Sequence, residues 1–556
     1  MGKPAEDLRA YIALGIIISS ALAFSLFFLY GSTPTPYGGD DSIYLNYAYT
    51  AATGRFSEMG FLALGGSPIF GIRLMQVLPI ALFFKLFGAG IFSGAMWDIL
   101  SFLGSIAATF LIGKELYGNK AGLFSALLLS LFPLVVSRAS TVNDNITMMF
   151  LTTLAMLCFV YGLKRSSRGW YAACGALLSA SITTTPEALI TSLVLAIYIL
   201  FSFVRTKRLP RGTACIAYGF AATLLLISIF NYANVGSPFL TLSLNNEFYG
   251  TTGPMHVSVT PSGFNLLEYP TAMFQYGAAA VYKITNPVAA MPQMYLSNLI
   301  PTGFYFYALI PFIVYLVVVR EKRAYFPIFW FLATFLYLEA GPMHIGVAPL
   351  SYIPMFKMLR FLILAAAPVT LIIGMALHRL LDDKGYPKAY RLAAVSAIIA
   401  FLAVTSVPLS VMWYYTIYYL NYNQISIAGY LGSLPNSTQI YSTGFFDNVL
   451  PYMGYANISR FHPTLLNCTG TRPVGYIIAI GQQYASQGVL KLPGCPAADM
   501  IPMPMHPNYI PIMGTILNYS NNLNVTLPYI PNNATSVREI NQEPMYLYRF
   551  GNATNG

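Results

Sequence analysis

The sequence predicts an α-helical membrane protein that crosses the bilayer many times and ends in a small α/β domain outside the membrane. Of its 556 residues, 56% are hydrophobic and only 9% are charged. Soluble domains contain roughly a quarter charged residues, so this composition excludes an ordinary soluble protein. Long apolar runs fill residues 1–413, whereas Asn, Pro, Ser and Thr become frequent in residues 414–556. The chain therefore divides into a transmembrane domain and a C-terminal domain at this change of composition.

Eleven apolar runs in the first domain have about the twenty-residue length that a membrane-spanning helix needs. They lie near residues 11–30, 93–113, 121–137, 146–163, 170–186, 187–204, 212–231, 300–319, 325–340, 359–378 and 392–413. Two longer connections, 31–92 and 232–299, are predicted to be external loops. In the C-terminal domain, residues 475–480 and 544–550 are predicted strands because apolar and aromatic residues stand there between Pro and Gly.

Residues 68–90 form one further apolar stretch, which we do not count as a span. The stretch contains Arg73 and Lys85. We expect a helix that lies along the outer membrane surface, with both basic side chains extended towards the headgroups.

The basic residues predict the orientation of the chain. They cluster in short connections between spans, on the side of the membrane where the N-terminus lies, and basic clusters of this kind mark the cytoplasmic side. An odd number of spans then places the C-terminal domain outside. The net charge of +11 is thereby explained without nucleic acid, and no interleaving of basic and aromatic residues indicates such a partner.

Glycosylation sequons support the same orientation. The motif Asn-x-Ser/Thr begins at Asn436, Asn457, Asn467, Asn518, Asn524, Asn533 and Asn552, all after the last span, and at Asn145 in a predicted external loop. Such sites are used only on the extracytoplasmic face, and their density suggests an archaeal cell surface. Cys468 and Cys495 lie in the same domain, where an oxidising compartment would allow a disulfide.

Two adjacent carboxylates, Asp40 and Asp41, follow the first span directly. An ionisable residue at membrane depth is costly to desolvate, which favours a functional role. The alternative is a solvated acidic turn, made easier by Gly38 and Gly39. The residues alone leave both interpretations open.

This segment resembles the first external loop of the type C glycosyltransferases, a family that includes protein O-mannosyltransferases and bacterial aminoarabinose transferases. The matching positions are Asp40, Asp41, Tyr44, Ala48 and Gly54, followed by Ser67-Pro68 and Leu86-Phe87-Gly88. The resemblance is good over residues 10–165 and weak over residues 340–380. It implies an inverting transferase that moves a sugar from a polyprenyl or dolichyl phosphate in the membrane to a protein, glycan or lipid on the extracytoplasmic face.

The resemblance also implies roles for individual residues. Asp40 is the expected base, which accepts the acceptor's proton, and Asp41 stands beside it where the family usually has Glu. The cations expected to hold the donor phosphate are Arg360, Lys357, Arg73 and Arg138. An arginine can form two parallel hydrogen bonds to a phosphate. For Arg360 the alternative is a side chain that merely reaches the membrane surface.

A second group of residues is expected to contact the substrates: Asp144, Tyr44, Glu187, His344 and Tyr352. Asp144, paired with Arg138, is expected to line a second side of the site with polar groups. Asp144 and Glu187 both lie near predicted helix starts, so each can instead be a helix cap. Glu187 also stands at a turn where relatives often have a basic residue.

Several motifs of other enzymes are missing from the sequence. There is no Gly-Lys-Ser/Thr phosphate loop, no Trp-Trp-Asp, and no Asp-x-Asp in the first loop. No cofactor is therefore expected; a divalent metal at Asp40, Asp41 and Asp144 is possible but not indicated. The rival hypotheses are a transporter or flippase for a lipid-linked substrate, which would show two related halves, and a non-catalytic subunit with the same fold.

Overall fold

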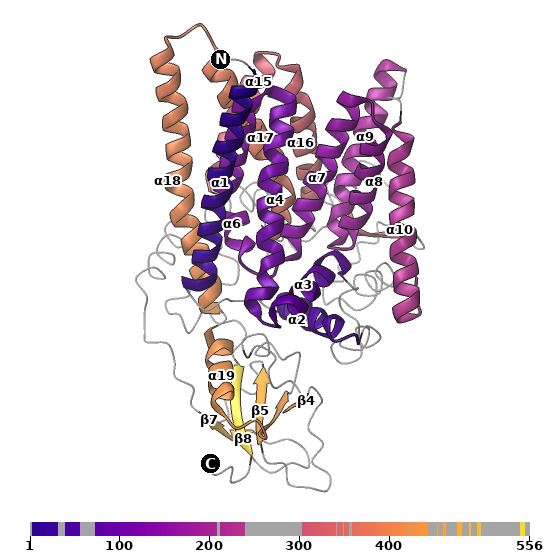
Figure 1. The fold of residues 1–556 in the computed structure, drawn as a ribbon, viewed down its shortest axis with the longest axis vertical. Helices are drawn as coiled ribbons and strands as arrows, with labels where there is room; N and C mark the ends of the chain where they lie inside the picture. Colours follow the sequence, from indigo (N-terminus) through magenta and orange to yellow (C-terminus); the bar gives the residue numbers. More distant parts are fainter. Residues whose placement is uncertain are drawn as a thin grey trace.

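In the computed structural model, helices packed side by side form a bundle, and a small sheet lies beyond one end of it (Figure 1). The structure describes residues 3–31, 39–55, 73–207, 212–238, 303–340, 342–347, 350–354, 359–420 and 422–442, and the shorter pieces 453, 460–462, 475–480, 489–490, 498–501 and 545–550. The loops with the predicted cytoplasmic clusters lie at the end where α1 begins, opposite the sheet (Figure 1).

Every predicted span falls on an apolar helix. Those long enough to cross a membrane are α1 (Lys3–Gly31), α4 (Ile91–Tyr117), α7 (Asp144–Arg165), α9 (Leu189–Thr206) with its preceding turn η3 (Pro186–Ala188), α10 (Ala214–Val235), α17 (Ile363–Asp382) with η6 (Leu359–Leu362), and α18 (Lys388–Leu420). Shorter ones are α8 (Arg168–Ile182), α15 (Tyr305–Val318) and α16 (Tyr325–Ala340). The described residues thus contain seven full-length candidates, and the number eleven stays a prediction.

An eighth candidate span is broken. Helices α5 (Asn119–Ser130) and α6 (Pro133–Ala139) meet at 63°. Pro133 has no N–H to continue the helical bonding, which accounts for the break. The buried Tyr305 hydroxyl donates to the carbonyl oxygen of Leu128 at 2.8 Å and so satisfies a backbone group near the bend.

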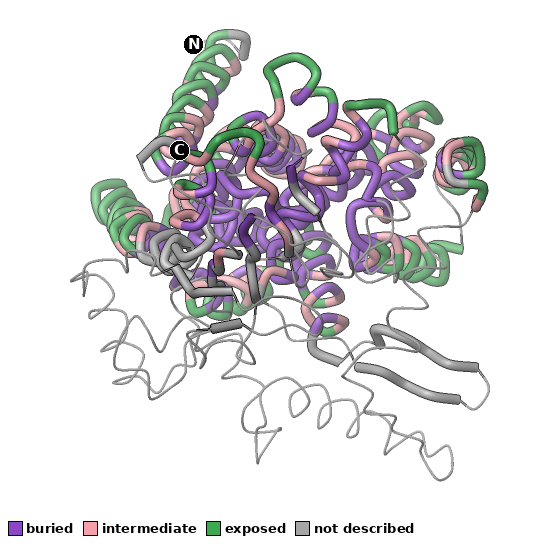
Figure 2. Tube along the Cα trace, turned by 90° about the horizontal axis from the view of Figure 1, so that it is seen from below, coloured by how far each residue is buried: buried purple, intermediate pink, exposed green. Residues whose placement is uncertain are grey.

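The core of the bundle surrounds α17, which is buried over 94% of its most apolar stretch. Buried segments occupy the middle of the bundle and exposed helices its rim (Figure 2). At the rim, α10 packs on α8 through glycines. A Cβ atom on Gly175 would lie 1.9 Å from the carbonyl oxygen of Ile216, and one on Gly219 2.0 Å from that of Ala172. Small residues allow this close approach of two helices in a membrane.

Two short helices, α2 (Gly39–Ala52) and α3 (Leu74–Phe87), lie across the end of the bundle nearest the sheet (Figure 1). With 14 residues, α3 is shorter than a span. Lys85 is exposed in its last turn, as a surface helix predicts. The expectation for Arg73 was wrong: this side chain is only 3% exposed and lies among polar groups rather than reaching outwards.

The C-terminal region contains a mixed six-stranded sheet. The order is β4 (Phe461–His462), β3 (Gln439–Ser442), β5 (Gly475–Ile480), β8 (Met545–Phe550), β7 (Ala498–Ile501) and β6 (Val489–Leu490). Strand β3 runs parallel to β4 and β5, and the other pairs are antiparallel. Strands β5 and β8 coincide with the two predicted strand segments. The predicted boundary at residue 413 falls inside α18, which continues to Leu420.

Helix α19 (Tyr422–Ser433) precedes the sheet, and Arg460 covers its C-terminal end. The Arg460 guanidinium donates to the carbonyl oxygens of Leu431, Leu434 and Pro435 at 2.6, 3.3 and 3.1 Å. Such bonds satisfy carbonyl groups that a helix end leaves without partners. Among the cysteines, Cys158, Cys174 and Cys215 are free, and Cys468 and Cys495 lie outside the described residues.

Candidate functional site

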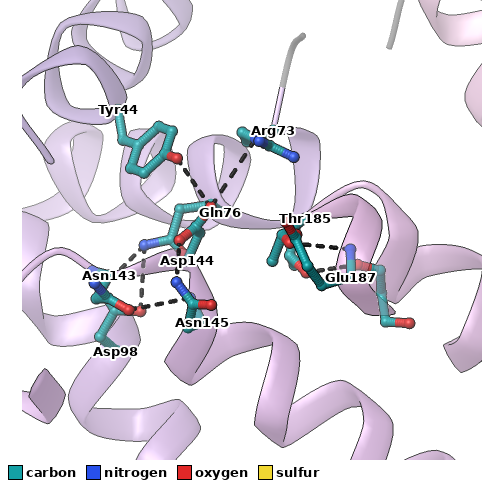
Figure 3. A network of polar contacts seen from close by, with 11 residues as sticks. Tyr44, Arg73, Gln76, Asp98, Asn143, Asp144, Asn145, Thr185 and Glu187 are labelled. Atoms are coloured by element: carbon teal, nitrogen blue, oxygen red, sulfur yellow. Dashed lines mark hydrogen bonds and ion pairs between the residues drawn. The ribbon is translucent and has the colours of Figure 1, made fainter. Parts of the chain in front are cut away.

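A buried polar network lies where α2, the start of α3, α4 and the start of α7 meet (Figure 3). Its centre is Asp144. The Tyr44 hydroxyl donates to Asp144 Oδ2 at 2.9 Å, and Arg73 Nε lies 4.0 Å from the same oxygen. Asn145 Nδ2 donates to the other oxygen at 2.8 Å. The Asp144 carboxylate is therefore held in one orientation by groups from three segments.

Asp98, in the second turn of α4, is a second buried carboxylate. Gln76 Nε2 donates to its two oxygens at 3.2 and 3.0 Å, the backbone N–H of Asn143 donates at 2.8 Å, and the Thr147 hydroxyl at 3.1 Å. Asp98 thus ties α3 and the N-terminus of α7 to α4, which fixes the positions of Arg73 and Asp144.

Asp98 and Gln76 were not among the residues predicted from the sequence. The available signal was a carboxylate inside the apolar run 93–113, because ionisable residues in spans are rare and almost always have partners inside the protein.

Replacing Asp98 tests this network. Asp98→Ala leaves three donor groups without an acceptor, at a cost of about 1–3 kcal/mol for each buried group. We expect a lower melting temperature in detergent and a loss of activity. Asp98→Asn should be milder, because its amide can still bond if the Gln76 amide rotates. The control is Asp382→Ala, at an exposed position of α17. An Asp98→Ala protein that melts and reacts like the wild type would contradict this role.

Helix capping does not explain Asp144. The N-cap of α7 is Asn143, whose side chain accepts from the backbone N–H of Asn145 at 3.2 Å. Asp144 instead directs its carboxylate at Tyr44 and Arg73. The prediction that Asn145 lies in an external loop was wrong, because this residue is 1% exposed, lies within α7 and donates to Asp144.

Glu187 lies in the turn η3, close to this network. The Thr185 hydroxyl accepts from the backbone N–H of Glu187 at 3.3 Å, so Thr185 caps the turn and Glu187 does not. The Glu187 side chain is buried. The guanidinium groups of Arg73 and Arg360 and the carboxylate of Asp144 all lie within electrostatic range of it. Figure 3 shows Arg73 between the Tyr44–Asp144 pair and the Thr185–Glu187 turn.

Arg360 reaches the same region from η6, at the start of α17. It is half-buried, and its guanidinium carbon lies 5.8 Å from the centre of the Phe361 ring. Its charge lies within electrostatic range of Glu187, as do the charges of Arg73 and Asp144. The fold thus gathers five of the predicted site residues at one end of the bundle: Tyr44, Arg73, Asp144, Glu187 and Arg360.

The two acidic residues of the first loop both lie in α2. Asp41 is 1% exposed. Asp40 occupies the first turn of α2, one helical turn before Tyr44, and its side chain lies outside the described part of the structure. Tyr47, on the same helix, is not a base at neutral pH: burial raises its pKa to about 12, and nearby Arg73 offsets only part of this increase. The carboxylates remain the candidate bases of α2.

The roles of four other predicted residues stay predictions. Arg138 is buried in α6, and its pairing with Asp144 stays a prediction. His344 and Tyr352 lie on a hairpin of β1 (Pro342–Val347) and β2 (Leu350–Pro354), and only their backbones are described. Lys357 lies outside the described residues.

No three His, Cys, Asp or Glu side chains come together as metal ligands within the described ranges. Asp40, one of the three carboxylates considered for a metal, falls outside this comparison because its side chain is not described. The metal requirement therefore stays untested.

Comparison with known proteins gives three findings. Residues 74–232 match the family described as dolichyl-phosphate-mannose-protein mannosyltransferase, a segment that includes Asp98, Asp144 and Glu187. No curated protein sequence matches the chain. Among solved structures, ArnT from Cupriavidus metallidurans in the apo state is 15% identical with a TM-score of 0.51, over 85% of this chain and 93% of ArnT.

Two further structures are similar. ArnT bound to undecaprenyl phosphate is 14% identical with a TM-score of 0.50, over 88% of this chain and 96% of ArnT. The apo oligosaccharyltransferase of Archaeoglobus fulgidus is 14% identical with a TM-score of 0.49, over 81% of this chain and 64% of that one. Identities this low show the fold alone. The match over residues 74–232 and the fold shared with ArnT agree with the resemblance of the Asp40–Gly54 segment to the type C membrane glycosyltransferases.

Proposed function

We propose that the protein moves a sugar from a polyprenyl or dolichyl phosphate to a protein, glycan or lipid acceptor on the outer face of a cell membrane. The observation that supports this most is the gathering of Arg73, Arg360 and Asp144 at the end of the bundle where α2 begins. A lipid phosphate lies at the membrane interface, so a site at a bundle end suits it. ArnT, which shares the fold, was solved with undecaprenyl phosphate bound.

The proposed reaction is a single displacement. The acceptor oxygen attacks the anomeric carbon while Asp40 accepts its proton, and the bond between that carbon and the phosphate oxygen breaks. The phosphate leaves with the bonding electrons, and the sugar inverts its configuration. A general base of this kind contributes roughly 10²–10⁴-fold to the rate.

The arginines stabilise the charge that develops on the leaving phosphate. Preorganised cations in a site with little water are often the largest contribution to such a reaction. Asp144 accepts from Tyr44 and lies beside Arg73, so it orients both groups. The Asp98 network in turn holds the segments that carry Arg73 and Asp144.

Incubation of the purified protein with a panel of polyprenyl-phosphate sugars tests this proposal. The readout is free polyprenyl phosphate, measured with protein, glycan and lipid acceptors. At least one donor should release its lipid phosphate in step with acceptor glycosylation. Transport of intact donor across a vesicle membrane without release would instead favour the transporter, for which the comparisons give no support.

The proposal places the N-terminus in the cytoplasm, with eleven spans and an external α/β domain of residues 414–556. Asn436 reports on this orientation, because it lies in an exposed turn closed by a bond from Thr438 N to Pro435 O of 3.0 Å. In a host that modifies Asn-x-Ser/Thr, peptide mass spectrometry should find a glycan on Asn436 and none on the buried Asn145. An unmodified Asn436 beside glycosylated external control proteins would contradict this orientation.

A further inference from the structure

We infer that Glu187 selects the donor sugar by its charge: the site accepts sugars that are neutral or bear an ammonium group and rejects sugars that bear a carboxylate. This inference rests on the proposed function, because it names the class of sugar attached to the lipid phosphate.

Glu187 is a largely buried residue whose carboxylate has little hydrogen bonding from the protein. The residue is 6% exposed, and the donor to its carboxylate is its own backbone N–H. The same N–H also donates to the Thr185 hydroxyl. A buried carboxylate is stabilised by several hydrogen bonds, because its desolvation is costly. Donor groups of a bound substrate would supply further bonds.

The position of Glu187 indicates which part of the substrate would do so. Arg73 and Arg360, the proposed phosphate ligands, are both within electrostatic range of its carboxylate. The sugar is bonded directly to that phosphate, so it lies within reach of Glu187 when the phosphate is bound. Tyr337 of α16 also lies within electrostatic range of Glu187, which places a third element around the same position.

The chemistry of a carboxylate then sets the preference. Carboxylate oxygens only accept hydrogen bonds, so they suit sugar hydroxyls or an ammonium group. A sugar carboxylate at the same place would meet a like charge in a region with little water, where repulsion is strong. The competing explanation is that Glu187 serves only as an internal counter-ion for the two arginines. In that case it would affect every donor equally.

The test compares three donors with the same polyprenyl phosphate: a neutral hexose, an amino hexose with a free ammonium group, and a hexuronic acid. We expect wild-type kcat/KM to be at least tenfold higher for the first two donors than for the third. Glu187→Gln should reduce this ratio at least tenfold, and Glu187→Asp should preserve it. Glu115→Gln is the matched control. Glu115 lies near the C-terminal end of α4, so its replacement should leave the ratio unchanged.

Each result has a separate meaning. If the wild type turns over no donor, the proposed function fails. If the wild type turns over the uronic acid donor as fast as the neutral one, the charge selection is overturned, whatever the variants do. If Glu187→Gln lowers kcat/KM equally for all three donors, the charge selection is also overturned. Glu187 would then serve only as a counter-ion for the two arginines. A Glu187-dependent preference for the amino sugar over the neutral sugar identifies ammonium pairing, and equal rates identify hydroxyl binding.

Discussion

Asp40→Asn is expected to lower the rate of sugar transfer by roughly 10²–10⁴-fold, the contribution of a general base. The amide has nearly the shape of the carboxylate but cannot accept the acceptor's proton. Donor binding should change little, because the phosphate is held by arginines. The measurement is release of polyprenyl phosphate under single-turnover conditions, together with the apparent affinity for the donor.

Asp382→Asn serves as the control for this experiment, because it removes an exposed carboxylate at the opposite end of the bundle. It should leave transfer unchanged. A purified Asp40→Asn protein that transfers at the wild-type rate would remove Asp40 from the mechanism. If a cell-based function survived Asp40→Asn while the purified wild type showed no transfer, the protein would be a non-catalytic subunit.

Arg360→Ala is expected to lower kcat/KM for the donor by about 100-fold or more. Hydrogen bonds to charged groups are worth about 1.5–3 kcal/mol, and a factor of ten in rate corresponds to about 1.4 kcal/mol. Arg360→Lys should recover part of the loss, because lysine restores the charge but not two parallel hydrogen bonds. The quantity to measure is the dependence of initial rate on donor concentration.

Lys85→Ala is the matched control, since Lys85 is an exposed basic residue on α3. If both variants weakened donor use equally, general attraction to the membrane surface would explain the effect, and Arg360 would have no specific role. Arg73 is less suitable for this comparison because it also contacts Asp144.

The helices of the membrane domain could be predicted from the sequence because a span needs a long apolar run, and α4, α7 and α17 each have one. The break between α5 and α6 was not predicted, although Pro133 marks it. Beside the break, the Tyr305 hydroxyl donates to the carbonyl oxygen of Leu128 from a helix far along the chain. Contacts of this kind follow from tertiary packing and leave no local pattern.

The candidate site was predictable where a residue belongs to a motif or stands at a helix start. Tyr44 and Asp144 were found in this way, and the structure joins them by a hydrogen bond of 2.9 Å. The roles of Arg73 and Lys85 could not be separated, because only the packing of α3 shows that the first is buried and the second exposed. Asp98 could have been suspected as a carboxylate within an apolar run, but its partners lie in separate segments and could not be predicted.

A structure of the Asp40→Asn protein with an intact polyprenyl-phosphate sugar would test the central claim most directly. We predict the phosphate within hydrogen-bonding distance of the Arg73 and Arg360 guanidinium groups, the anomeric carbon facing residue 40, and the sugar beside Glu187. A donor phosphate bound away from both arginines, or residues 40 and 360 lining separate cavities, would contradict the proposed mechanism.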